Sequence, residues 1–166
     1  MTRDEDLGQT WHLPAALAAA AALAVAIVGM TLTDLGPWYQ SLRQPDWAPP
    51  AVFYGIAWTT IYALAALAAV SAWLGTRNRR ESDTVIAAFA LNGFLNMLWS
   101  LLFFNARRPD WAFTEGLLLW LSVASLIVIS LRHSRTAALL LMPYLAWVSA
   151  AGLLNYEVVR LNGPFG

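Results

Sequence analysis

The chain has 166 residues, and its ten Lys or Arg residues balance ten Asp or Glu residues, so the formal net charge is zero. Apolar residues make up 59% and charged residues 12%, with a mean hydropathy of +0.55, whereas soluble domains are about half apolar and about a quarter charged. This composition excludes a disordered chain, a nucleic-acid binder and, because cysteine is absent, a disulfide-stapled secreted module. It leaves nine tryptophans unexplained.

Charged residues separate five apolar stretches, at about 13–33, 51–76, 84–105, 112–131 and 136–159. Each is about as long as the ~20 residues that cross a hydrocarbon core. In lipid the backbone must be helical or form a closed barrel, and barrel strands alternate apolar and polar residues, whereas residues 15–28 are continuously apolar. We therefore predict an all-α membrane protein, a single bundle of five transmembrane helices over residues 13–160. An acidic N-terminal tail (1–12) precedes it and a C-terminal tail (161–166) follows.

The alanine-rich first stretch has an alternative interpretation as a secretory signal peptide. A signal begins with a positively charged region, but here Asp4, Glu5 and Asp6 follow a lone Arg3, so a first membrane helix is favoured. Six arginines lie on the side of the N-terminus and four on the opposite side. This difference leans toward a cytoplasmic N-terminus.

The connection between the first two stretches is rich in aromatic residues and proline. It contains Trp38, Tyr39, Pro45, Trp47, Pro49 and Pro50. Prolines remove backbone donors and disfavour helix in the residues before them, so we expect an extended, stiff segment. Two interpretations remain open: an aromatic belt at headgroup level, or a rigid lid over a pocket between the helices.

Three of the predicted helices carry aromatic and asparagine residues at helical spacing. The three stripes are Tyr54, Trp58 and Tyr62; Asn92, Asn96, Trp99 and Phe103; and Tyr144, Trp147, Ala151 and Asn155. Each stripe alone is explained by ordinary helix packing with asparagines bonded across an interface. Together they could instead line a cavity with flat aromatic faces, which suits a large, flat, mostly apolar ligand.

The remaining polar residues give weaker signals. His12 and His133 lie at helix ends without a second ligand at metal spacing, so no metal site is predicted. Glu115, near the start of the fourth predicted helix, is either solvated at the interface and favoured by the helix N-terminus or a ligand or dimer residue. No nucleophile or acid–base pair is visible inside the predicted bundle.

Motifs along nearly the whole chain after the first stretch carry a resemblance. They are Trp38-Tyr39, Leu42, Pro45, Trp47, Pro49-Pro50, Phe53, Trp58 and Tyr62; Asn96, Trp99, Phe103-Phe104, Arg107 and Trp111-Ala112; and Pro143 to Trp147, Leu154 to Tyr156, Arg160 and Asn162. The set resembles the translocator protein family, whose bacterial members are called tryptophan-rich sensory proteins and whose animal members are peripheral benzodiazepine receptors. The acidic segment up to about Gln9 departs from the family.

The resemblance implies a five-helix bundle, usually a homodimer, with a pocket that opens toward the first loop and requires no cofactor. It implies binding of porphyrins such as protoporphyrin IX and haem, of isoquinoline or benzodiazepine ligands and of sterols, with a role in tetrapyrrole or stress regulation. The expected place is a bacterial cell membrane, with the outer membrane as alternative. Taken with the loop and the stripes, the expected ligand-binding residues are Trp38, Tyr39, Trp47, Pro49, Tyr54, Trp58, Tyr62, Asn92, Asn96, Trp99, Trp147, Ala151 and Leu154.

Leu153, Tyr156 and Arg160 resemble the sterol motif proposed for the family. Because successive helical residues turn by about 100°, Tyr156 lies about 180° from Trp147 around one helix. We therefore expect two separate sites, with Tyr156 and Arg160 facing lipid or a partner subunit.

The resemblance also implies an enzymatic alternative, because some bacterial members degrade protoporphyrin IX in a reaction that depends on light and oxygen. Trp58 and Trp147 would be the residues that carry this activity. A purely structural membrane subunit is a third hypothesis, but it would need neither a pocket nor a lid.

Overall fold

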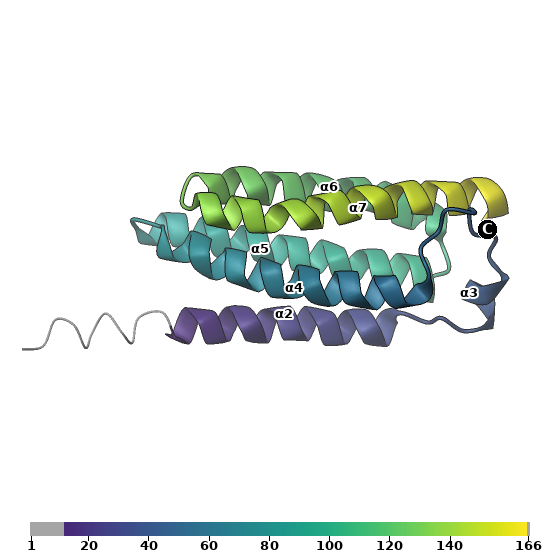
Figure 1. Cartoon of the computed structure of the whole chain (residues 1–166), viewed down its shortest axis with the longest axis horizontal. Coiled ribbons are helices and arrows are strands. Elements are labelled where there is room, and N and C mark those ends of the chain that lie inside the picture. The colour runs from purple at the N-terminus through teal and green to yellow at the C-terminus, as the bar shows by residue number, and fades with distance from the viewer. Residues whose placement is uncertain (1–11, 166) are drawn as a thin grey trace, which may run out of the picture.

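The computed structural model describes residues 12–165, with side chains from Ala16 onward (Figure 1). Its helices are α2 (His12–Leu32), α3 (Pro37–Ser41), α4 (Ala51–Leu74), α5 (Arg79–Ser100), the π-helix η1 (Leu101–Asn105), α6 (Pro109–Leu131) and α7 (Arg135–Asn162). Residues 12–165 contain no strand. The acidic residues of the N-terminal tail and the side chain of His12, which entered the sequence predictions, lie outside the described residues.

Four segments are long and apolar enough to cross a membrane: Ala51–Leu74, Arg79–Asn105, Pro109–Leu131 and Arg135–Asn162. The part of α2 with described side chains is a shorter apolar helix, Ala16–Leu32. The prediction of an all-helical membrane fold is thus confirmed for four of the five expected spans.

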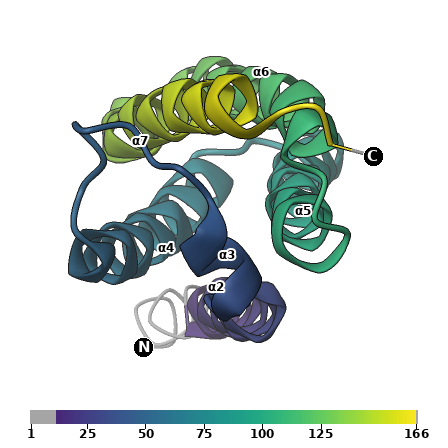
Figure 2. The same cartoon turned by 90° about the vertical axis from the view of Figure 1, so that its right-hand side faces the viewer.

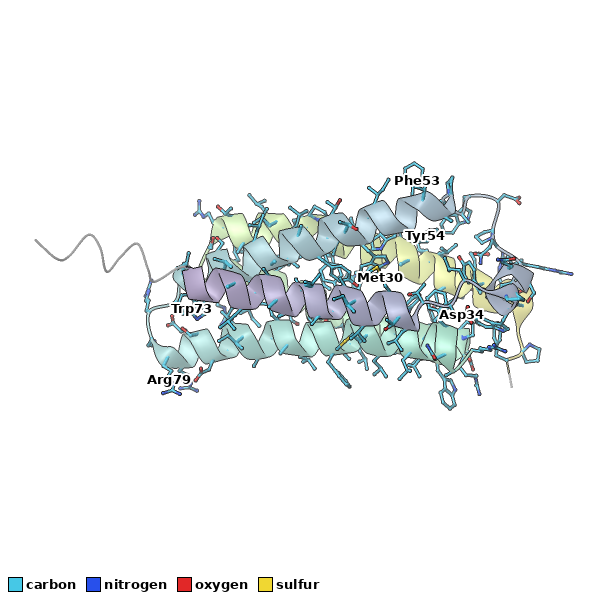
Figure 3. The ribbon with its side chains drawn as sticks, turned by 90° about the horizontal axis from the view of Figure 1, so that it is seen from below. Met30, Asp34, Phe53, Tyr54, Trp73 and Arg79 are labelled. Carbon is cyan, nitrogen blue, oxygen red and sulfur yellow. The ribbon has the colours of Figure 1, made fainter. Side chains whose placement is uncertain are left out.

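The helices are arranged as a ring, and Figure 2 looks along its axis. Contacts run in the order α2, α4, α7, α6, α5 and back to α2. The chain connection between α4 and α5 lies at one end of the ring, and α3 lies at the other, which we name the α3 end (Figure 1). Trp73 and Arg79 mark the first end and Asp34 the second (Figure 3).

The packed core occupies mainly the half of the ring away from α3. Its most buried members come from four helices and include Ala68, Ala72, Val85, Leu126 and Leu141. Gly75 permits the close approach at that end, because a Cβ there would lie only 2.3 Å from the backbone oxygen of His133. A smaller cluster at the α3 end contains Leu42, Phe103, Phe104, Ala112 and Val158.

Helix capping explains where the predicted boundaries were wrong. The Asn78 side chain accepts a hydrogen bond from the Glu81 backbone (3.0 Å), and the Glu81 carboxylate accepts one from the Arg77 backbone (2.8 Å). With Asn78 as the N-cap, α5 begins at Arg79 rather than at 84. Pro109, at the first position of α6, similarly moves its start from 112 to 109.

The first connection is non-helical over its proline-rich part, as expected, but a short helix precedes that part. Pro37 starts the short helix α3, which contains Trp38 and Tyr39. Residues 42–50 are then non-helical, as their prolines predict. The side chain of Asn162 accepts a hydrogen bond from the backbone of Arg43 (2.8 Å) and donates to its carbonyl (2.9 Å), which fastens this segment to the end of α7.

Candidate ligand-binding site

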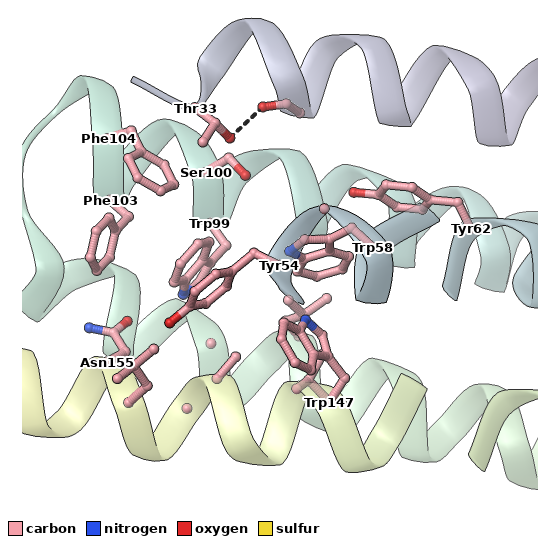
Figure 4. A pocket seen from close by; sticks show the side chains of 18 of the residues that line it. Thr33, Tyr54, Trp58, Tyr62, Trp99, Ser100, Phe103, Phe104, Trp147 and Asn155 are labelled. Atoms are coloured by element: carbon pink, nitrogen blue, oxygen red, sulfur yellow. Dashed lines mark hydrogen bonds between the residues drawn. The ribbon is translucent and has the colours of Figure 1, made fainter. Parts of the chain in front are cut away.

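A cavity of about 1250 Å³ lies mainly in the α3 half of the ring, with walls from α2, α4, α5, η1, α6 and α7. We call it the central cavity, and Figure 4 shows part of its wall. Pockets for small molecules commonly measure about 300–1,000 Å³ and are mostly apolar. The central cavity therefore has room for a large ligand.

Aromatic rings from α4 and α7 form one wall of the central cavity. Phe53 points out of the bundle (Figure 3), whereas its neighbour Tyr54 turns toward Trp147, with ring centroids 5.8 Å apart (Figure 4). One turn further, Trp58 stacks on Tyr62 at 5.5 Å and lies edge-on to Trp147 at 6.3 Å. The predicted α4 stripe therefore faces the cavity, because residues spaced by four share one helix face.

The π-helix η1 supplies a second aromatic wall. Its consecutive residues Phe103 and Phe104 are both buried, with ring centroids 4.8 Å apart. Trp99 stacks on Phe103 at 5.0 Å. Tyr39 closes over Phe104 at 5.7 Å, and burial raises the pKa of its phenol.

Small residues of α2 leave the space opposite these rings unfilled. They are Ala19, Ala22, Ala26 and Gly29. A Cβ at Gly29 would lie 3.5 Å from the hydroxyl of Tyr62, in ordinary contact. Sequence reasoning missed this wall, although the alanine run was visible, because a run of alanines is equally typical of any apolar helix.

Eight of the thirteen predicted ligand-binding residues line the central cavity. They are Tyr39, Tyr54, Trp58, Tyr62, Trp99, Trp147, Ala151 and Leu154. Among the others, Trp38 packs edge-on against Phe103, and Trp47 is 53% exposed. Trp38, Trp47 and Pro49 are absent from the wall formed by the described residues.

Asn92 and Asn96 are absent from the wall formed by the described residues and join helices, so their role in ligand binding stays a prediction. Asn96 accepts a hydrogen bond from the Tyr62 hydroxyl (2.9 Å) and donates one to the Tyr144 hydroxyl (3.1 Å). Asn92 donates to Ser122 (2.8 Å). These bonds link α4, α5, α6 and α7, as the packing interpretation of the stripe predicts.

The sterol-motif residues lie on the outer side of α7, as helical geometry predicts. Leu153 is 63% exposed and Tyr156 49% exposed, and Arg160 pairs with Glu157 at 2.6 Å. Leu153 and Tyr156 nevertheless border the same continuous cavity as Trp147. Leu153 and Tyr156 thus point in a different direction from Trp147 around α7, but all three border one cavity.

Charge is confined to the ends of the helices, and no charged side chain lines the central cavity among the described residues. Arg108, before α6, pairs with Asp110, which raises the pKa of the guanidinium, and the guanidinium lies 4.3 Å from the centre of the Trp111 ring. Within residues 16–165 no three His, Asp or Glu side chains converge as a metal site would require. The cavity is thus built for apolar and aromatic contacts.

Glu115 is an exception on α6 because it is only 5% exposed. Neither carboxyl oxygen has a hydrogen-bond partner among the described residues. This burial contradicts the interpretation in which interfacial water solvates Glu115.

Replacing Glu115 by leucine is expected to leave the free energy of unfolding unchanged or raise it by about 1–3 kcal/mol, because an unpartnered buried polar group costs about that much. Thermal unfolding of the ligand-free protein in detergent measures the effect, with Glu115→Gln as the isosteric control. Clear destabilisation by both substitutions would support the alternative in which a dimer partner contacts the carboxyl group.

Sequence comparison matches residues 15–161 to the TspO/MBR family. The chain is 34% identical to the tryptophan-rich protein TspO of Chlorobaculum tepidum over 90% of its own length and 96% of that protein. It is 34% identical to a tryptophan-rich sensory protein of Cereibacter sphaeroides (75% and 77% covered) and 34% identical to the human translocator protein (75% of each covered). These matches and the apolar helices support a membrane receptor or transport role, and the chain belongs to the TspO/MBR family.

Proposed function

We propose that the protein is an integral membrane receptor or transport protein that binds a porphyrin, either protoporphyrin IX or haem, in the central cavity. Its regulatory role would concern tetrapyrrole metabolism or stress. The observation that carries this proposal is a cavity of about 1250 Å³ walled by the rings of Tyr54, Trp58, Trp147, Trp99 and Phe103. Flat aromatic faces suit a flat aromatic macrocycle because offset stacking adds to apolar burial.

The polar groups of the cavity are consistent with such a ligand. The indole nitrogen of Trp147 is buried without an acceptor among the described residues, and a ligand oxygen or nitrogen at this wall would satisfy it. With no charged side chain in the described wall, the carboxylates of a porphyrin would project out of the cavity. Sterol-like, isoquinoline and benzodiazepine-type ligands would use the same apolar walls.

The proposal includes α2 as a fifth membrane span. Its 21 residues reach about 32 Å at ~1.5 Å per residue, which matches a hydrocarbon core of ~30 Å. A bacterial cell membrane and a homodimer belong to the same proposal.

Titration of the purified protein with protoporphyrin IX tests the proposed binding, followed through the porphyrin absorption band. We expect saturation and displacement by an isoquinoline carboxamide that competes for the cavity. Uptake that rises without saturation, as in protein-free micelles, would contradict the proposal.

A second candidate function is light-dependent oxidation of bound protoporphyrin IX by dioxygen. It is supported by the two indoles of Trp58 and Trp147, whose centroids are 6.3 Å apart in the wall of the same cavity. Both rings would lie against a bound macrocycle, within reach of the reactive species that an illuminated porphyrin forms with oxygen.

Trp147→Phe is expected to slow bleaching of protoporphyrin IX under light and air, because phenylalanine keeps an apolar ring but lacks the readily oxidised indole. Absorbance over time at saturating protein measures the rate, with dark and argon-flushed samples as references and Trp47→Phe, outside the cavity, as the matched control. Equal bleaching by wild type, Trp147→Phe and free porphyrin in detergent would exclude the enzymatic function.

A further inference from the structure

We propose that ligands enter and leave the central cavity from the side, through a gap between α6 and α7 at Gly116 and Gly152. This inference rests on the proposed ligand binding but concerns the route, which membership of the family does not specify. We call the opening the α6–α7 gap.

The first observation is the continuity of the cavity. Its wall includes Trp58 and Trp147 on the inside of the ring, and also Leu117, Trp120 and Leu153, which are exposed on the outer faces of α6 and α7. Gly116 and Gly152 line the cavity on these same two helices. The cavity therefore extends between α6 and α7 to the surface that would face lipid.

The second observation is that neither glycine is needed for close packing. A Cβ at Gly152 would meet nothing within 4 Å among the described residues. A Cβ at Gly116 would meet only Trp99, at the ordinary contact distance of 3.5 Å. Glycine within a helix is unfavourable relative to alanine, and in membrane helices its usual use is close approach of two backbones. Here the missing side chains leave open space instead.

Contacts between α6 and α7 bracket the gap along the helix axes. On one side the Trp120 indole donates a hydrogen bond to the Ser149 hydroxyl (2.8 Å). On the other side Phe113 contacts Tyr156, with centroids 5.8 Å apart. Gly116 falls between positions 113 and 120, and Gly152 falls between positions 149 and 156. These two contacts hold the helices together above and below the two glycines.

A buried hydrogen bond adds to this frame at the α3 end, where the Asn155 side chain donates to the carbonyl of Pro109 (2.9 Å). The residues that border the gap are apolar, aromatic or hydroxyl-bearing, and none of those described is charged. The route suits flat or slender apolar molecules that have already partitioned into the bilayer.

The cavity is also bordered by partly exposed residues of α2 and α4, among them Leu23, Met30 and Gly55. A Cβ at Gly55 would likewise meet nothing within 4 Å among the described residues. Among the described residues, no hydrogen bond or aromatic pair joins α2 to α4 on this side. This side therefore provides the competing route that the experiment must distinguish.

Reversible chemical blocking of the α6–α7 gap tests the proposal. Because the chain contains no cysteine, a thiol reagent will label only the cysteine that is introduced. Three single variants are compared in phosphatidylcholine nanodiscs: Gly152→Cys at the gap, Gly55→Cys at the competing side, and Ala146→Cys as a matched control on the exposed face of α7, away from the cavity. Each is labelled with benzyl methanethiosulfonate, checked by mass spectrometry, and later released with dithiothreitol. Protoporphyrin IX is added in lipid vesicles, and stopped-flow measurement of the quenching of tryptophan fluorescence gives the association and dissociation rates.

Labelled Gly152→Cys is expected to show both rates at least about tenfold slower, with Kd changed by less than about threefold, since a blocked route raises a barrier without altering the bound state. Dithiothreitol should restore both rates, which excludes misfolding as the cause. Labelled Ala146→Cys should behave as wild type, and labelled Gly55→Cys, which also borders the cavity, should slow neither rate as much as labelled Gly152→Cys does. Three results would exclude the α6–α7 gap as the route while leaving the proposed binding intact. They are slower rates for labelled Gly55→Cys alone, unchanged rates for labelled Gly152→Cys, or a Gly152→Cys thiol that cannot be labelled. Absence of saturable binding by unlabelled protein would instead refute the proposed function.

Discussion

Trp147→Ala is expected to weaken the binding of protoporphyrin IX by about 30-fold or more, because aromatic residues at the centre of a binding site commonly contribute about 2 kcal/mol or more. Trp147 lies between the rings of Tyr54 and Trp58, at centroid distances of 5.8 and 6.3 Å. Its removal would delete the α7 ring of this wall and leave Tyr54 and Trp58 without the ring that contacts both. The Kd should be measured from porphyrin absorption rather than tryptophan quenching, since the substitution removes one of the reporters.

Three variants serve as controls for this effect. Trp147→Phe should retain most of the affinity because an aromatic face remains. Trp47→Ala should leave Kd unchanged, since Trp47 is exposed and outside the described wall, and Tyr156→Ala should alter Kd much less than Trp147→Ala. If Trp47→Ala lowered the affinity for protoporphyrin IX as much as Trp147→Ala does, the first connection would be a ligand-contacting lid.

Asn96→Leu is expected to lower the free energy of unfolding by about 1–3 kcal/mol, the usual cost of leaving buried polar groups unpartnered. Asn96 is buried and bonds to the hydroxyls of Tyr62 and Tyr144. Leucine cannot replace either bond, so two hydroxyls from two different helices would lose their partner. Denaturant or thermal unfolding in detergent gives the change in stability, and the porphyrin titration gives Kd on the same samples.

A double-mutant cycle with Tyr144→Phe assigns the loss to the bond itself, because the second substitution should cost little once Asn96 is gone. Asn105→Leu is the matched control, since Asn105 makes a single exposed bond to the carbonyl of Leu32. If Asn96→Leu preserved stability but abolished porphyrin binding, Asn96 would be a ligand-contacting residue, as the sequence suggested.

The sequence predicted the aromatic walls well because they follow from local spacing. Residues four apart on a helix share a face, so Tyr54, Trp58 and Tyr62 had to lie together whatever the tertiary structure. Membrane spans were predictable for a similar reason, since length and hydropathy alone define them.

Properties that depend on neighbouring helices were harder to predict. An asparagine in an apolar stripe needs a partner, but whether that partner is a ligand or another helix depends on where Tyr62 and Tyr144 lie. The stripe therefore could not assign Asn96 to one role or the other. No stripe gave a role to Trp120, because its partner Ser149 is far away in the chain and adjacent only after α6 and α7 pack.

The central cavity also depends on positions where the residue is alanine or glycine and leaves space unfilled. The small residues of α2 and the glycines at 116 and 152 carry no chemical signal, and their effect is visible only when the large side chains around them have been placed. The π-helix is a further case, since its bonding pattern at Leu101–Asn105 has no recognisable signal in the sequence.

Parallel titration of wild type and a Trp58→Ala, Trp147→Ala double variant with protoporphyrin IX tests the central claim most directly. The wild type should saturate at one porphyrin per chain, while the double variant, shown to be folded by its helical circular dichroism, should take up no more than empty micelles do. Equal saturable binding by both proteins would contradict the assignment of the central cavity as the porphyrin site.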